Sequence, residues 1–517
     1  FLFVPLLTMG LISREINNGT IKLLYSSPIR TRDIVLGKYL AIMLYNLVLV
    51  LILGIFLVSS IFNVKDADTG LLAAAVLGFF LLMCTYTAIG LFMSSLTTYQ
   101  IVSAIGTFIL VFVLDRIGGL WQQYDFVRDI TYFLSISGRT SKMLAGLITT
   151  NDVMYFILVV AMFLFFTYFK LKGAREIKPW FIKASRYLAV VIAVVTIGYF
   201  CSRPANIGYW DTTRDDVNTI HPNTQQVVKE LGKEPMTITL YCNLLGDGSA
   251  KGFPAGRNEY MWVLWEKYLR FKPDIEFKYV YYYDQADGDS TLFRRFPNKT
   301  MKEIAALMAD GSNESFGKYL PPDEIRKQID LSREGYRLVM KVDYKGKSTF
   351  LRTFNDNVFW PEELQVSAAL KRLLQDKMPT VLYTTGNLER NIYKTGEREY
   401  NLHSLAIGNR NSLVNLGFDA DTISLDNRDV PPSTDILVLA DPKTTLSPVM
   451  QNRVNQFIAN GGNMMFFAEP GKQQMLNPIL QPMGLTLMNG TLVQLSRNEM
   501  PHMATPLHHT HGGRHGR

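Results

Sequence analysis

Long apolar runs in the first two hundred residues constrain this chain more than any other feature. They lie at roughly 39–62, 72–94, 97–114, 153–169 and 187–201. A helix of about 20 apolar residues, with a tolerated range of about 17–25, crosses the hydrocarbon core of a bilayer. The first two runs meet that length easily, the fourth only just meets it, and the fifth needs its flanking residues. The N-terminal part is therefore predicted to be a bundle of membrane-spanning helices.

The composition changes at about residue 203. Residues 1–203 contain 17 Lys+Arg against 9 Asp+Glu, which leaves 36 residues of each sign for 204–517. The net positive charge therefore belongs to the membrane part, where Lys and Arg mark cytoplasmic loops. The soluble part has no Lys/Arg run interleaved with aromatic residues, so no nucleic-acid partner is predicted.

Two basic loops predict the direction of the spans. Segments 14–38 and 170–186 are rich in Lys and Arg, and such residues near span ends resist translocation, so both loops are predicted to be cytoplasmic. The loop 115–152 between them is balanced in charge. The number of crossings between the basic loops is even, which agrees with this assignment. One further crossing at 187–201 places everything after Arg203 outside.

The first basic loop has internal structure of its own. Residues 17–19 (Asn-Asn-Gly) break the chain, a short apolar face follows at 21–24, and Pro28 ends it. Thr31 is predicted to cap a helix that begins near Asp33. From this pattern alone the loop is a short amphipathic element at the membrane surface.

The order of motifs in this region adds a resemblance. Pro5-Leu-Leu-Thr-Met-Gly, Asn18-Gly19-Thr20, Ser27-Pro28 and Ile34-Val-Leu-Gly37-Lys38 follow one another as in the permease subunits of type-2 ABC exporters, which this chain resembles over residues 1–175. Ile16 departs from that family's pattern. The resemblance implies short helices on the outer face before the 153–169 run. It also implies that the loop rests on an ATPase subunit through Glu15, Gly19, Thr20, Leu23, Leu24 and Pro28.

No nucleotide-binding motif of the Walker type occurs in the chain. The nearest candidate, Gly311 to Gly317-Lys318, has the wrong spacing and is followed by Tyr319. Any ATP must therefore be bound and hydrolysed by a partner subunit, and no cofactor is predicted here.

The soluble part alternates helices and strands. Its clearest element is the strand DILVLADP at 435–442, a helix at 447–459 and the strand GGNMMFFAEP at 461–470, a spacing typical of a parallel βαβ unit. The other predicted elements are helices near 222–231, 257–272 and 361–375, strands at 236–243, 275–283 and 380–385, a polar insertion after 283, and a hairpin at 337–354 that turns at Lys345-Gly346.

This part shows a second resemblance. Asp211-Thr-Thr-Arg, Pro273-Asp-Ile-Glu-Phe, Asp435-Ile-Leu-Val-Leu and Gly461-Gly462-Asn463 are similar to the auxiliary extracytoplasmic component of gliding-motility-type (Gld G-like) ABC transporters. That family carries its α/β domain between two membrane helices, of which 187–201 matches the first. The chain begins inside an apolar stretch without a methionine, and we expect it to be cut short at both ends.

Catalytic motifs are missing from the soluble part. Neither GxSxG nor HExxH occurs. Asp441 and Glu469 follow neighbouring strands, where active sites of α/β folds form, although turn and cap roles are commoner for such residues. The lone His221 and His403 are predicted to be structural or exposed.

The cysteines and the C-terminal histidines predict neither a disulfide nor a metal site. The three cysteines form no CxxC pair, and unpaired thiols are favoured over a Cys201–Cys242 bridge. Residues 501–517 form a His/Gly-rich tail of a kind that binds divalent metals. Tail disorder or a truncation scar is the preferred interpretation, because no packed second shell could form around these histidines, and no metal site is predicted.

Together these features predict a membrane α-helical permease bundle followed by an extracytoplasmic α/β domain with parallel βαβ units. The expected function is that of a non-enzymatic subunit of an ATP-driven exporter in the bacterial inner membrane, with a periplasmic auxiliary domain and a gliding-motility or envelope role. Its expected partners are an ABC ATPase, a second permease copy or paralogue, the bilayer and an envelope protein. A membrane-anchored scaffold that moves no substrate and a membrane-tethered hydrolase are the alternatives. The predicted domains are 1–176 (permease), 177–203 (additional span), 204–375 and 376–500 (two α/β subdomains) and 501–517 (tail).

The topology is testable with single-cysteine reporters in a chain whose own cysteines are replaced. Reporters at Ser27 and Gly173 should resist a membrane-impermeant thiol reagent in intact cells, whereas a reporter at Thr219 should be labelled, because only the last lies outside. Labelling of Ser27 together with protection of Thr219 would invert the topology.

Overall fold

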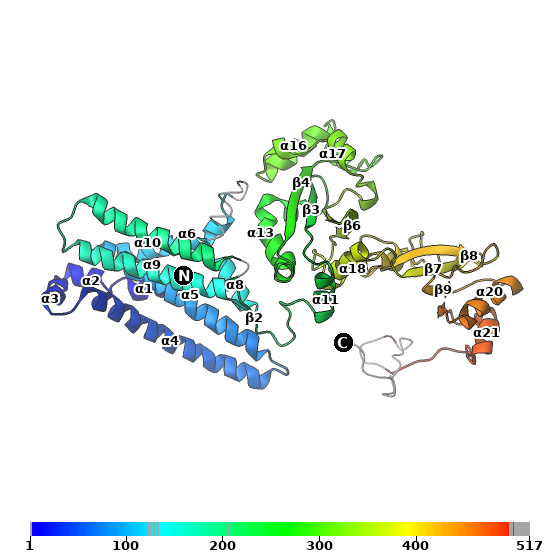
Figure 1. The fold of residues 1–517 in the computed structure, drawn as a ribbon, viewed down its shortest axis with the longest axis horizontal. Helices are drawn as coiled ribbons and strands as arrows, with labels where there is room; N and C mark the ends of the chain where they lie inside the picture. The colour runs from blue at the N-terminus through cyan, green and yellow to red at the C-terminus, as the bar shows by residue number, and fades with distance from the viewer. Residues whose placement is uncertain are drawn as a thin grey trace. The chain divides into compact units, whose positions relative to one another are not determined.

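The protein forms two compact units, and Figure 1 shows their elements in a computed structural model. Unit 1 comprises Phe1–Pro235 and Leu240–Leu338, and unit 2 comprises Met236–Thr239 and Val339–Arg517. The structure describes residues 3–495 and 500, apart from 122–123, 125–126, 128–130, 132–133 and 204–205.

Unit 1 begins with a bundle of helices, of which five are long and apolar enough to cross a membrane. They lie side by side in Figure 1. Four of the apolar runs predicted to span the membrane fall within them, whereas the run at 97–114 begins three residues before the third helix, which starts at Gln100. The five helices are α4 (Thr31–Asn63), α5 (Thr69–Leu96), α6 (Gln100–Arg116), α9 (Thr150–Gly173) and α10 (Trp180–Cys201), and three short helices accompany them: α1 (Phe3–Thr8), α2 (Ser13–Asn17) and α3 (Ile21–Ser26).

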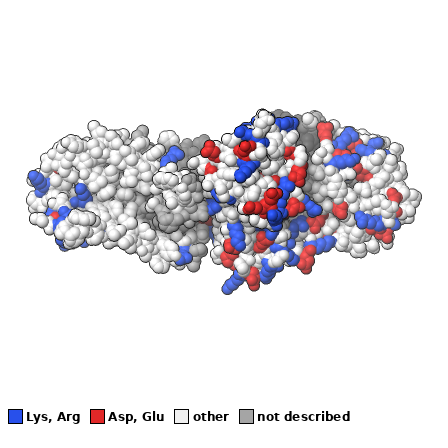
Figure 2. Space-filling model, turned by 90° about the horizontal axis from the view of Figure 1, so that it is seen from above, with Lys and Arg blue, Asp and Glu red and all other residues white. Residues whose placement is uncertain are grey.

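Helix α5 occupies the centre of the bundle and α4 lies at its surface. Ala88, Ile89 and Leu91 of α5 are fully buried, whereas α4 exposes apolar side chains such as Leu51 and Phe56. Lipid tails would cover these exposed side chains as well as protein does, so a spanning helix can be apolar all round. The figures agree with this: in Figure 2 the face over the bundle is almost free of charge except at its ends.

One pair of polar side chains inside the spans joins two helices. Asn46 Nδ2 of α4 donates to Thr87 Oγ1 of α5 over 2.8 Å, and both side chains are fully buried. Thr87 Oγ1 in turn donates to the carbonyl oxygen of Met83. In a bilayer these groups have no water to bond to, so pairing between helices favours this packing.

The two basic loops meet at one end of the bundle. Arg175, which follows α9, lies 3.5 Å from Thr31 Oγ1 and 5.1 Å from the Tyr25 ring centroid of α3. The predicted start of the helix near Asp33 with Thr31 as its cap is wrong: α4 begins at Thr31, and Arg30 occupies the cap position without a side-chain cap. The Thr31 hydroxyl accepts from Arg175 instead.

The opposite end of the bundle carries the short helix α8 (Ser137–Leu144) and the strand β1 (Leu147–Thr149), which pairs with β2 (Tyr209–Asp211) after the last span. The short helix lies before α9, where the resemblance placed one. The rest of unit 1 contains α11 (Pro222–Glu230), α12 (Ser249–Gly252), α13 (Arg257–Tyr260), α14 (Glu266–Leu269), β4 (Ile275–Tyr282), α15 (Thr291–Arg295), α16 (Met301–Gly311) and α17 (Pro322–Gln328). The single helix expected at 257–272 is thus a helical run whose middle, Met261–Trp265, has π-helical hydrogen bonding.

One mixed sheet has the strand order β4-β3-β5-β6, with β3 at Met236–Asn243, β5 at Val339–Tyr344 and β6 at Lys347–Arg352. β5 and β6 are antiparallel and join at Lys345-Gly346, as predicted. Both turn residues have positive φ, 47° and 78°, which is typical of the tight turns whose twist matches a hairpin.

A second sheet, wholly in unit 2, is parallel and has the order β10-β9-β7-β8. Its strand β9 is apolar on both faces: Leu437 and Leu439 pack with Met450, while Val438 packs with Ile392. This confirms the predicted parallel βαβ unit. Besides β5 and β6, unit 2 contains α18 (Glu363–Leu374), β7 (Thr380–Thr385), α19 (Asn401–Ser404), β8 (Asp419–Ser424), β9 (Ile436–Ala440), α20 (Pro448–Ala459), β10 (Asn463–Phe467) and α21 (Gln473–Leu480).

The close packing of α1 on α5 gives a stability prediction. A Cβ added at Gly90 of α5 would overlap the Thr8 side chain of α1, whereas one added at Gly54 of α4 would meet nothing within 4 Å. Gly90→Ala should therefore lower the free energy of unfolding by about 1–3 kcal/mol, and Gly54→Ala should leave it unchanged or raise it. Thermal unfolding of the purified protein in detergent measures both. Equal midpoints for the two variants would contradict this packing.

Candidate functional site

The first basic loop forms two short helices at one end of the bundle. α2 and α3 are separated by Asn18–Thr20, where Gly19 has φ 73°, a conformation that favours glycine. Ile21 of α3 is buried against the bundle, while Leu23 is 70% exposed. Leu24 is half-buried, and Pro28 is exposed in the segment that leads to α4. Before α4 begins, the loop therefore presents two large apolar side chains to its surroundings, Leu23 and the less exposed Ile29 (45%).

Glu15 fastens this loop to the bundle. Its Oε1 lies 2.5 Å from Lys38 Nζ of α4, and Lys38 also donates to the carbonyl oxygen of Leu11 over 2.8 Å. Thr20 Oγ1 donates to the carbonyl oxygen of Glu15 over 3.3 Å. The predicted coupling residues thus divide into those that hold the loop (Glu15, Gly19, Thr20) and those that lie at its surface (Leu23, Leu24, Pro28).

The other end of the bundle is joined to the chain that follows α10. The carbonyl oxygen of Gly146, next to β1, accepts hydrogen bonds from Thr212 N (2.9 Å) and Thr212 Oγ1 (2.8 Å). Asp68 accepts from Leu71 N at the start of α5 and from Arg214 N, both over 2.9 Å. A Cβ at Gly70 would overlap the carbonyl oxygen of Thr212. We call these contacts, together with the β1–β2 pair, the outer junction.

A partly buried ion pair strengthens the outer junction. Lys142 Nζ of α8 lies 2.8 Å from Glu266 Oε1 of α14, and the two side chains are 10% and 20% exposed. Arg270 donates to the carbonyl oxygen of Asn218 and lies 4.4 Å from the Tyr209 ring centroid of β2. None of these residues stands out in the sequence, because they lie far apart along the chain. The junction links α5, α8 and α9 to the first α/β elements.

In unit 2, Asp441 and Glu469 come together beyond the carboxyl ends of β9 and β10. Lys443 contacts both carboxylates, with Glu469 Oε2 at 2.8 Å, and Arg390 lies 2.8 Å from Glu469 and 3.5 Å from Asp441. The hydrogen bond from Lys443 holds the pKa of Glu469 below its usual value. A general acid needs a raised pKa. This geometry therefore favours a paired, charged surface over a catalytic one.

The strand order explains where this cluster lies. The chain runs from β7 outward to β8 and then from β9 outward to β10, so the order reverses between β7 and β9, the place where ligands of parallel sheets usually bind. The loops that follow these two strands are tied together: Lys443 N donates to the carbonyl oxygen of Asn387 over 2.8 Å, and Thr444 Oγ1 donates to Asn387 Oδ1 over 3.1 Å. Asp441, at φ 53°, is buried there.

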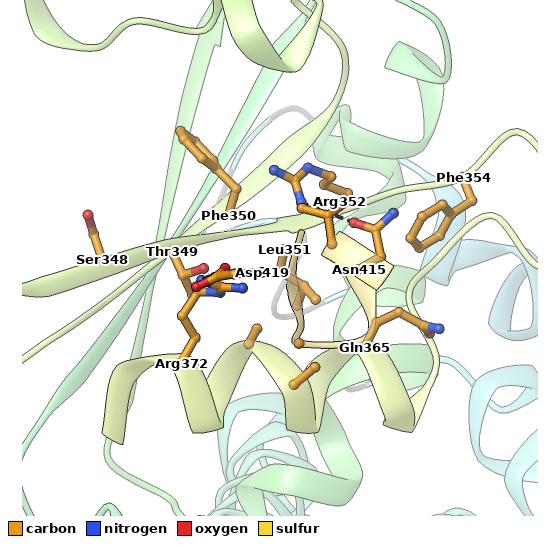
Figure 3. A pocket seen from close by; sticks show the side chains of 14 residues that line it. Ser348, Thr349, Phe350, Leu351, Arg352, Phe354, Gln365, Arg372, Asn415 and Asp419 are labelled. Carbon is orange, nitrogen blue, oxygen red and sulfur yellow. Dashed lines mark hydrogen bonds and ion pairs between the residues drawn. The ribbon is translucent and has the colours of Figure 1, made fainter. Parts of the chain in front are cut away.

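Unit 2 also has a cavity of about 280 Å³ between β6 and α18 (Figure 3). Its charged and polar side chains are paired with each other: Arg372 lies 2.8 Å from Asp419, and Arg352 Nη1 donates to Asn415 Oδ1 over 3.0 Å. No charge of one sign dominates this cavity, so its chemistry does not single out a ligand.

The remaining candidates have structural roles or lie outside the described residues. His221 Nδ1 accepts from Asn223 N and so caps α11, and His403 lies in α19. The thiols of Cys84, Cys201 and Cys242 are free, so the Cys201–Cys242 bridge is not formed. The tail histidines fall outside the described residues.

Comparison with known families places two domains on this chain. Residues 3–172 match the family described as ABC-2 family transporter protein, and residues 379–505 match the family described as ABC-type uncharacterized transport system. The chain joins an ABC-2 permease domain to an ABC transport auxiliary domain. The permease match contains α2, α3 and all spans up to α9, and the auxiliary match contains Asp441 and Glu469. Neither a curated protein nor a solved structure matches the chain.

The Lys142–Glu266 pair makes the outer junction of this ABC transporter subunit testable. Lys142→Glu places two carboxylates together in a partly buried site, which should cost about 3–5 kcal/mol of junction stability, and the swap Lys142→Glu/Glu266→Lys should restore most of it. The rate of limited tryptic cleavage at the exposed Arg214 reports junction opening. Faster cleavage in the single variant and a near-native rate in the swap are expected. An unchanged rate in Lys142→Glu would show that the pair does not hold the junction.

Proposed function

We propose that this ABC transporter membrane subunit belongs to an exporter and engages a separate ATPase through α2 and α3. The observation that carries the proposal is the loop of the ABC-2 domain, which is fixed to the bundle by Glu15 and Lys38 yet leaves Leu23 70% exposed. Exposed apolar side chains of short helices bind partner proteins by inserting into apolar grooves. An ATPase docked here would move α4 directly, because α3 and α4 are separated only by residues 27–30.

The proposed orientation follows from charge. The basic loops share the end that carries α2 and α3, and Lys and Arg near span ends remain in the cytoplasm. The auxiliary domain then lies in the periplasm of a bacterial inner membrane. There, the outer junction would transmit movement of α5 and α9 to the α/β elements that follow α10. A gliding-motility or envelope role is part of the proposal through the resemblance of the auxiliary domain.

For the auxiliary domain we propose binding without catalysis. The strand-end surface around Asp441 and Glu469 presents paired charges at the switch point of a parallel sheet, where recognition sites form. A hydrolase would need a nucleophile, a base and an orienting group together. A scaffold without transport would use the same surfaces, so only transport-linked ATP turnover separates it from an exporter.

A pair of single substitutions tests ATPase docking. Leu23→Asp should reduce co-purification of the ATPase subunit at least tenfold, because it places a charge at the proposed interface. Ile177→Asp is the matched control: Ile177 is an exposed apolar residue at the same basic end of the bundle but lies outside α2 and α3. Retention of the ATPase by Leu23→Asp, or equal loss in both variants, would reject docking through α3.

A further inference from the structure

A basic pocket of about 440 Å³ lies beside the α2–α3 loop at the same end of the bundle. The residues that line it come from the start of α4 and the end of α9, two spans far apart in sequence. Figure 2 shows blue side chains gathered at this end of the bundle, whose middle is almost free of charge. The lining residues are Arg30, Thr31, Arg32, Tyr168, Lys172, Arg175 and Glu176.

The pocket has an excess of positive charge that its own carboxylate does not neutralise. Four cations line it against one acid, Glu176. Glu176 is engaged by Arg186 at 2.8 Å and by Lys172 and Lys178 at 3.6 Å each, and the bond from Arg186 lowers its pKa. Within the described part of the chain Arg30 has no ion-pair partner.

Backbone groups add to this charge. Thr31 is the first residue of the 33-residue helix α4, so the unbonded N–H groups and the positive end of the helix dipole lie at the pocket. Arg175 is positioned there by its contacts with Thr31 and with the Tyr25 ring. A guanidinium group held next to a helix N-terminus, with further cations around it, is suited to a phosphate group.

We propose that this pocket binds the phosphate of an anionic membrane lipid. Basic pockets between spans at the cytoplasmic surface bind anionic headgroups. A lipid fits better than free phosphate because Tyr168, in the last turns of α9, lines the pocket, and aromatic side chains at span ends lie at headgroup level. The proposal needs the bundle to lie in a membrane but does not depend on an ATPase.

The alternative to a lipid site is that these cations serve only to orient the spans in the membrane. Orientation requires charge near the span ends but no particular geometry, so any two cations of this end would be equivalent. A lipid site instead requires Arg30 and Arg175 for lipid binding and does not require cations outside the pocket. Arg14 and Lys22, on α2 and α3, lie at the same end without lining the pocket.

The experiment compares the full chain with two charge-matched double variants in lipid nanodiscs. Phosphatidylglycerol retained by the protein is counted by native mass spectrometry against a phosphatidylcholine background. At about fivefold per cation removed, Arg30→Gln/Arg175→Gln should weaken phosphatidylglycerol binding about 25-fold, while Arg14→Gln/Lys22→Gln should bind as the parent chain does. Arg30→Gln alone breaks no ion pair and should weaken phosphatidylglycerol binding about fivefold. It serves as a control in case the double variant misfolds.

Two further arms separate the sources of phosphate. Inorganic phosphate should displace the lipid only weakly, and phosphatidylcholine should not replace it. Equal loss in the two double variants, binding of phosphatidylcholine as tight as that of phosphatidylglycerol, or full displacement by equimolar inorganic phosphate would each overturn the proposal. Loss of ATPase docking in Leu23→Asp with lipid binding intact would leave it standing, so the two proposals fail independently.

Discussion

The hydrocarbon core of the bilayer is the constraint on which the rest of this structure depends. Every backbone N–H and C=O group at that depth must be hydrogen-bonded within the protein. An α-helix meets this requirement within a single segment, and the N-terminal part is built from such helices. Side chains such as Leu51 and Phe56 are then free to face outward, and packing around α5 decides how the spans assemble. Asn46 and Thr87 bond to each other there, and Thr85 and Thr107 bond to backbone carbonyl oxygens of their own helices.

The ion pairs of the membrane part consequently lie at the two ends of the bundle. At the basic end, the Glu15–Lys38 pair fixes the α2–α3 loop, and Arg175 packs against Tyr25. At the other end, main-chain hydrogen bonds of the β1–β2 pair and the Lys142–Glu266 bridge join the spans to the first α/β elements. The helices α5 and α9 run from one end of the bundle to the other.

In the auxiliary domain, charged side chains gather at the ends of the strands. Its parallel sheet brings the ends of β7, β9 and β10 together, and this concentrates Asp441, Glu469, Lys443 and Arg390 in one place. The carboxylates there are matched by cations, which suits recognition of a polar partner. In the cavity between β6 and α18, Arg372 pairs with Asp419 and Arg352 bonds to the neutral amide of Asn415.

Periodicity and charge in the sequence determined the spans, the shared end of the two basic loops, the hairpin at Lys345-Gly346 and the βαβ unit, because these depend on residues close together in the chain. The start of α4 escaped prediction since the Thr31 hydroxyl bonds to Arg175. Tertiary structure alone decided that Glu15 holds the loop while Leu23 faces outward, that Lys142 meets Glu266, and that Arg30 and Arg175 share a pocket. Each of these depends on contacts between residues distant in sequence or on the direction of a side chain, which no local pattern encodes.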